Sequence, residues 1–196
     1  MPSRRPTIPK ATRDVVLNEF NHRCAMCGAD RPQIHHIDGD PANNAPENLL
    51  PLCPNNHLLD SHNPTQPVDK DKLRLLRRFK DPLILSPAFD PLFRRALFLL
   101  QLRDIPFEQD VMQSNAEELV AFVRALSMGT FYADQLQQLL SPPPNPGCFT
   151  ENTSDLEYRQ HRERGEREFR DKLLSNQNAA VCLLVELLRY QVWPAT

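Results

Sequence analysis

The residues best suited to chemistry in this chain are histidines, cysteines and an asparagine gathered between positions 24 and 57. The adjacent His35 and His36 precede Asn48, and His57 follows. Imidazole nitrogens bind divalent cations, and a neutral imidazole accepts a proton at pH 7 because the ordinary pKa of histidine is about 6.5. A cation held beside a general base is the minimum needed to hydrolyse a phosphodiester bond.

Three of the five cysteines lie in the same stretch. Cys24 and Cys27 form a C-x-x-C pair and Cys53 follows among the histidines, whereas Cys148 and Cys182 stand alone. An odd count with one C-x-x-C pair indicates metal binding in a reducing compartment and not a disulfide framework. The basic start of the chain lacks the apolar segment of a signal peptide, and no apolar run reaches the about 20 residues of a membrane span. We expect a cytoplasmic protein without a membrane partner.

Short elements must position these side chains. The apolar pattern predicts a helix over residues 11–20 and extended segments at 33–37 and 46–52, with a turn between the two extended segments. Residues 53–56 then begin a helix that carries His57 on its first turn. The expected unit is a β-hairpin followed by a helix. Because so small a unit buries little apolar surface, it needs a metal ion as a staple.

The order and spacing of these residues resemble those of one nuclease family. The string Asn-Leu-Leu-Pro-Leu-Cys begins at Asn48, and eight residues separate Asn48 from His57. Together with the adjacent histidines, this closely resembles the HNH endonucleases over roughly residues 10–62. The resemblance implies the ββα-metal fold, with His35 and His57 as ligands of a catalytic Mg²⁺ or Mn²⁺ ion. It also implies that His36 is the general base and that Asn48 fixes the loop and the orientation of the histidine.

Two points of chemistry qualify these roles. Imidazole ligands also suit Zn²⁺ or Ni²⁺. Neighbouring residues of a strand point to opposite faces, so His35 and His36 share one site only if the backbone bends there.

The resemblance also implies a structural zinc ion held by two C-x-x-C pairs. Here the second pair reads Cys-Pro-Asn-Asn from Cys53, so Asn56 stands where the fourth cysteine belongs, and an amide oxygen is a poor zinc ligand. Three interpretations stay open. His62 replaces the missing thiolate beside Cys24, Cys27 and Cys53, or the site has lost zinc and its thiols pack as apolar groups. In the third, water or another side chain completes the coordination.

The net charge of −2 conceals an uneven distribution along the chain. Residues 69–103 carry a net charge of +5, whereas residues 1–68 carry −1 and residues 104–196 carry −6. A basic segment directly after the histidines is where a polyanion such as DNA would bind. The candidate DNA contacts lie on two predicted helices and are Arg74, Arg77, Arg78, Arg94 and Arg95. The alternative is a solvated helix face opposite a core of Leu and Phe.

The remainder of the chain is predicted to be helical, which makes the whole protein α+β. Helices are expected to end near residue 80 and to cover residues 91–102, 115–126, 130–140 and 154–192. We therefore expect a nuclease domain at 1–68 and a helical domain at 69–196, subdivided near the proline-rich residues 141–150.

The last predicted helix contains an apolar run at residues 179–188, in which we expect Cys182 to be buried. An all-round apolar helix needs burial on several sides, either inside the chain or against a protein partner or a second copy of the chain.

The function these features predict is a metal-dependent HNH endonuclease that hydrolyses DNA and nicks one strand per site. A small protein of this kind with an unassigned helical half resembles the effector of an anti-phage or restriction system. Two alternatives remain: a non-catalytic zinc-knuckle protein that binds nucleic acid or acts as a scaffold, and an RNA-cleaving HNH nuclease. Cleavage of a phosphodiester does not by itself distinguish DNA from RNA.

Overall fold

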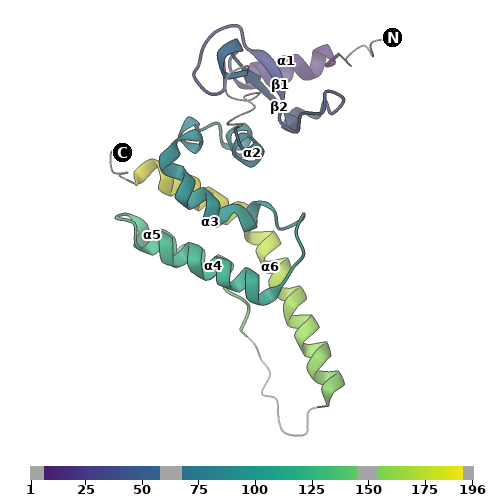
Figure 1. Cartoon of the computed structure of the whole chain (residues 1–196), viewed down its shortest axis with the longest axis vertical. Helices are drawn as coiled ribbons and strands as arrows, with labels where there is room; N and C mark the ends of the chain where they lie inside the picture. The colour runs from purple at the N-terminus through teal and green to yellow at the C-terminus, as the bar shows by residue number, and fades with distance from the viewer. Residues whose placement is uncertain (1–6, 58–67, 145–153, 192–196) are drawn as a thin grey trace. The chain divides into compact units, whose positions relative to one another are not determined.

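The computed structural model describes residues 7–57, 68–144 and 154–191. It has an α+β architecture in which helices predominate and one two-stranded antiparallel sheet lies in the N-terminal part (Figure 1). The chain divides into two compact units, Met1–Ser86 and Pro87–Thr196. The sequence predicted a boundary after residue 68, whereas helix α2 (Lys70–Phe79) belongs to the first unit in the structure.

The first unit contains the predicted hairpin. Helix α1 (Lys10–Glu19) precedes strand β1 (Gln33–His36), and a 3₁₀ turn η1 (Pro46–Asn48) leads directly into strand β2 (Leu49–Leu52). The strands pair so that His35 lies opposite Leu50 and His36 opposite Leu49. Helical turns begin at residue 54, where the backbone N–H of His57 donates to the carbonyl of Cys53.

The core of the first unit lies between the hairpin and α2. Its buried members come from the C-x-x-C segment, from the residue after β1, from β2 and the residue after it, and from α2: Cys24, Ile37, Leu50, Leu52, Cys53, Leu73 and Leu76. Two candidate metal ligands are thus part of this core. The unit is closed by a further 3₁₀ turn, η3 (Pro82–Leu85), which Asp81 caps by accepting from the backbone N–H of Leu83.

The second unit consists of the 3₁₀ turn η4 (Pro87–Phe89) and four helices: α3 (Asp90–Leu100), α4 (Gln109–Arg124), α5 (Gly129–Leu140) and α6 (Asp155–Tyr190). Helix α4 packs against α3 and α5, while α6 packs against α3, α4 and α5. Ser154 and Glu157 start α6 with a reciprocal capping box.

The long helix α6 is buried only in its C-terminal half. Its first turns run beyond the other helices of this unit and are largely exposed, and its buried side chains extend from Phe169 to Leu188 (Figure 1). Cys182 is exposed, so the prediction that it is a core residue is wrong: it lies on the outward face of the helix, between buried Val181 and Leu184. No described helix is both long and apolar enough to cross a membrane.

Candidate functional site

Three of the predicted site histidines line one hollow of about 610 Å³ in the first unit: His35, His36 and His57. His35 is 5% exposed on β1. The ring of His57 lies edge-on to the ring of His35, with centroids 5.3 Å apart and an interplanar angle of 82°. The structure therefore brings together side chains separated by 22 positions of sequence, because the hairpin places β1 beside the turn that follows β2.

His35 and His36 share this hollow although they are neighbours on a strand. His36 is the last residue of β1, and its carbonyl accepts from the backbone N–H of Gly39 at 3.1 Å, which begins a turn. Gly39 has φ = +83°, a left-handed conformation that favours glycine. The backbone thus turns directly after His36.

The side chain of Asn44 holds the ring of His36. Its Oδ1 lies 3.2 Å from Nε2 of His36. An amide oxygen only accepts hydrogen bonds, so this contact is a hydrogen bond in the tautomer that carries its proton on Nε2. In the neutral ring, Nδ1 then holds the lone pair and is the nitrogen able to accept a proton. Sequence reasoning missed Asn44, which has no fixed spacing from the histidines and stands among several turn-forming residues.

Asn48 pins the loop that joins the strands. Its Oδ1 accepts from the backbone N–H of Asp38 at 3.0 Å, and its Nδ2 donates to Asp38 Oδ1 at 2.9 Å and to the carbonyl of Asn43 at 3.0 Å. The carbonyl of Asn48 also accepts from the N–H of Ile37. These contacts fix the segment that carries Asn44, so Asn48 reaches His36 through the loop and not by a direct contact.

The carboxylate of Asp38 is the centre of this loop network. Partial burial opposes its ionisation, but hydrogen bonds from Asn48, from the backbone of Asp40 and from Asn43, together with nearby His36, lower the pKa of Asp38 to about 2. The carboxylate is therefore charged at neutral pH and occupied by loop donors. Asp38 acts as a structural acceptor, and Lys70 on α2 secures the same turn by donating to its carbonyl at 2.7 Å.

Three cysteines form a separate cluster that could hold a metal ion such as zinc. The sulfur atoms of Cys24, Cys27 and Cys53 all lie within 4.8 Å of one another, and Cys27 Sγ is 3.7 Å from Cys53 Sγ. Hydrogen bonds from the N–H of Cys24 to Ala29 and from the N–H of Gly28 to Cys24 close the C-x-x-C turn. A further bond from the N–H of Ala25 to Pro51 attaches this turn to β2, next to Cys53.

Asn56 faces the cluster as a hydrogen-bond donor. Its Nδ2 donates to Cys24 Sγ at 3.3 Å, and its backbone N–H donates to Cys53 Sγ at 3.5 Å. Burial raises the pKa of the Cys24 thiol, but backbone hydrogen bonds from Cys53, Cys27 and Met26 and the Asn56 amide outweigh it and lower this pKa to about 7. His62, the predicted fourth ligand, lies outside the described residues.

The five predicted DNA-contact arginines differ in their surroundings. Arg77 is 8% exposed: it pairs with Glu19 at 2.7 Å and donates through Nε to the carbonyl of Pro46, so it joins α2 to α1 and η1. Arg95 is similarly engaged, 3.1 Å from Glu118 and stacked on the ring of Phe122.

The other three arginines are exposed. Arg74 pairs with Asp71 on its own helix, Arg78 lies over the ring of Phe79, and Arg94 is exposed on α3. Arg77 and Arg95 therefore serve the packing of their units, and Arg74, Arg78 and Arg94 remain the members of the predicted set able to reach a polyanion.

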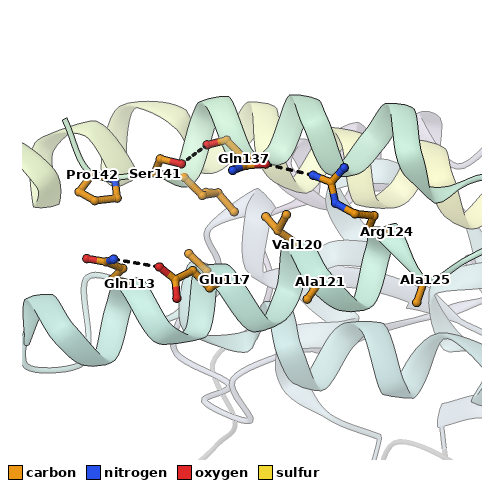
Figure 2. Close-up of a pocket in the computed structure, with 11 residues that line it drawn as sticks. Gln113, Glu117, Val120, Ala121, Arg124, Ala125, Gln137, Ser141 and Pro142 are labelled. Atoms are coloured by element: carbon orange, nitrogen blue, oxygen red, sulfur yellow. Dashed lines mark hydrogen bonds between the residues drawn. The ribbon is translucent and has the colours of Figure 1, made fainter. Parts of the chain in front are cut away.

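A further hollow, of about 550 Å³, lies between α4 and α5 in the second unit (Figure 2). Its polar side chains are hydrogen-bonded to one another, Gln113 to Glu117 at 2.8 Å and Arg124 to Gln137 at 3.0 Å. None of the described residues that line it is a histidine or a cysteine. The histidine hollow of the first unit therefore remains the better candidate for chemistry.

Comparison with known proteins identifies no relative: no protein-family model, no curated protein and no solved structure matches this chain.

Proposed function

We propose that this protein is a metal-dependent endonuclease that hydrolyses phosphodiester bonds of DNA, with an HNH-like ββα unit as its nuclease domain. One observation carries the proposal. His35, His36 and His57, which the motif predicts to act together, line a single hollow beside the hairpin. Asn48, the fourth motif residue, supports the proposal by pinning the loop behind them.

The hollow offers a donor set that fits a divalent cation. His35 and His57 lie edge to face at its wall and supply two imidazole ligands, which leaves further coordination positions for water and substrate oxygens. A divalent cation bound there supplies positive charge to a phosphoryl oxygen and to the leaving oxygen. The two imidazoles place Mn²⁺ ahead of Mg²⁺ as the ion to test first, because Mg²⁺ prefers oxygen ligands.

His36 is the general base of the proposed reaction. With the Nε2 proton directed at Asn44, the lone pair on Nδ1 takes a proton from the attacking water. The resulting hydroxide forms the new bond to phosphorus, and the bond to the leaving oxygen breaks. That oxygen takes a proton from solvent, which completes the hydrolysis.

The test is cleavage of supercoiled plasmid by the purified protein in Mn²⁺ or Mg²⁺. We expect His36→Ala to lower the rate by at least about 100-fold, the lower end of the usual contribution of a general base. Its helical circular dichroism and its affinity for a DNA duplex without added Mn²⁺ or Mg²⁺ should match those of the wild type, because His36 is only partly buried and lines a hollow.

His22→Ala is the matched control. His22 is an exposed histidine that bonds Asn18 and does not line the hollow, so its loss should change the rate by less than about twofold. A His36→Ala protein that cuts as fast as His22→Ala would remove His36 from the base role. A wild-type protein that cuts no plasmid in either cation would contradict the proposal as a whole.

A further inference from the structure

The histidine hollow carries a positive charge that the motif does not account for. Arg13, on the first turns of α1, lines the hollow together with the three histidines. None of the described residues that line it is acidic. A guanidinium in a hollow without carboxylates creates a local positive potential, which attracts an anion and repels a second cation.

Arg13 is also exposed. Its backbone N–H continues the first turn of α1 by donating to Pro9, but within the described residues its guanidinium forms no hydrogen bond or ion pair. Arg77 of the same unit differs, because its guanidinium pairs with Glu19 and donates a hydrogen bond to the carbonyl of Pro46. The five donors of Arg13 are therefore available to a ligand in the hollow.

Another hollow of this unit is a less suitable place for a phosphate. It lies on the other side of the loop and is lined by basic side chains of α2, but also by Glu19, Asp38 and Glu47. Its carboxylates offset its cations. The Arg13 hollow has no such offset and contains the candidate reacting groups, so it is the better place for a phosphate.

We propose that Arg13 is a substrate-binding residue that holds a phosphate of the nucleic-acid backbone in the histidine hollow. The proposal rests on the proposed function for the identity of the ligand. Arginine suits the task because its planar fork donates two parallel hydrogen bonds to phosphate oxygens. The sequence motif does not include position 13, and only the fold brings α1 to the edge of the hollow.

The experiment measures binding apart from cleavage. A fluorescein-labelled 20-base-pair DNA duplex is titrated with the full-length protein, without added Mn²⁺ or Mg²⁺, at 50 to 200 mM salt, with anisotropy as the readout. The loss of one phosphate contact should reduce the slope of log affinity against log salt by about 0.9 for Arg13→Ala. Arg13→Lys keeps the charge and should keep the slope.

Arg170→Ala is the matched control, since Arg170 is an exposed arginine of α6 in the other unit and its removal changes the net charge equally. It should leave the slope unchanged. The proposal is supported if the slope falls for Arg13→Ala alone. It is overturned if Arg13→Ala keeps the wild-type slope, if Arg170→Ala lowers the slope as much, or if the wild type does not bind the duplex.

The two proposals fail in different ways. A wild-type protein that binds DNA through Arg13 but cuts no plasmid would defeat the nuclease and leave the phosphate contact standing. If instead the wild type cuts plasmid, but wild type and Arg13→Ala bind DNA with the same salt slope, the nuclease proposal stands and the phosphate contact of Arg13 is overturned.

Discussion

Asn56 stands beside the three-cysteine cluster as a hydrogen-bond donor. Its amide group lies 3.3 Å from the Cys24 sulfur, at the position in the motif where a fourth thiolate would close a tetrahedral zinc site. As a donor to sulfur, the amide stabilises a thiolate. It adds no strong ligand of its own. Among the described residues, three sulfur atoms lie close enough to hold a metal ion such as zinc.

Replacing Asn56 by cysteine should give the three-cysteine cluster a fourth sulfur ligand. We expect Asn56→Cys to tighten zinc binding by about tenfold or more, because a fourth thiolate replaces a weaker ligand. Competition with a chromophoric zinc chelator measures the affinity. Asn55→Cys is the control: Asn55 is exposed one position earlier, and a thiol there should leave the affinity unchanged. Equal affinities in wild type and Asn56→Cys would mean that another group already supplies the fourth ligand.

For single residues, the sequence predicts which side chains gather but not which hydrogen bonds orient them. The spacing of His35, His36 and His57 predicted that the three side chains gather, and all three line one hollow. The contact between Asn44 and His36 was not predictable, since it depends on the path of a turn-rich loop. Asn48 was expected to fix the loop and the orientation of the histidine, and its side-chain hydrogen bonds go to Asp38 and Asn43 of the loop.

Among the elements, the junction of α4 and α5 depends on Gly129. A Cβ atom added at Gly129 would lie 1.6 Å from the carbonyl oxygen of Val123, which is far inside van der Waals contact. Only glycine therefore lets α5 begin so close to the last turns of α4. Gly165, within α6, has open space where its Cβ would be.

Substitution by alanine should have opposite effects on stability at Gly129 and at Gly165. Gly129→Ala should lower the free energy of unfolding by about 3 kcal/mol or more, because the backbone must shift to admit the methyl group. Gly165→Ala should raise it by about 0.5–1 kcal/mol, the usual gain within a helix. Urea denaturation followed by circular dichroism measures both. A stable Gly129→Ala protein would show that the junction relaxes easily.

The secondary structure was largely predictable because short-range rules determine it. Within the described residues, both strands and the helices expected at 11–20 and after residue 68 form near their predicted bounds, and the helix expected to follow Cys53 is described only to residue 57. The largest error is the start of α4, at Gln109 and not at 115: Met112 continues the buried row of Ala116 and Leu119. The ion pairs of Arg77 and Arg95 were not predictable, since their partners Glu19 and Glu118 lie on other helices.

For the whole molecule, the basic segment divides between the two units. Residues 1–86 carry 12 basic and 10 acidic side chains, a net charge of +2, while residues 87–196 carry 11 and 15, a net charge of −4. Arg74 and Arg78 thus belong to the unit with the histidines, whereas Arg94 belongs to the acidic unit. The proposed binding of DNA by the first unit therefore does not require the second unit on electrostatic grounds.

Separating the units tests this division. We expect residues 1–86, produced alone with zinc, to unfold cooperatively, to bind the DNA duplex and to cut plasmid, because the hairpin, cysteine cluster and histidine hollow all lie within them. Residues 87–196 alone should be helical and, with their net charge of −4, should not bind the duplex at 150 mM salt. Thermal melting by circular dichroism, anisotropy and plasmid cleavage measure these outcomes.

A first unit that folds and binds DNA but cuts plasmid only after the second unit is added back would show that the helical unit takes part in catalysis. A first unit that stays unfolded with zinc would show that the two units fold as one.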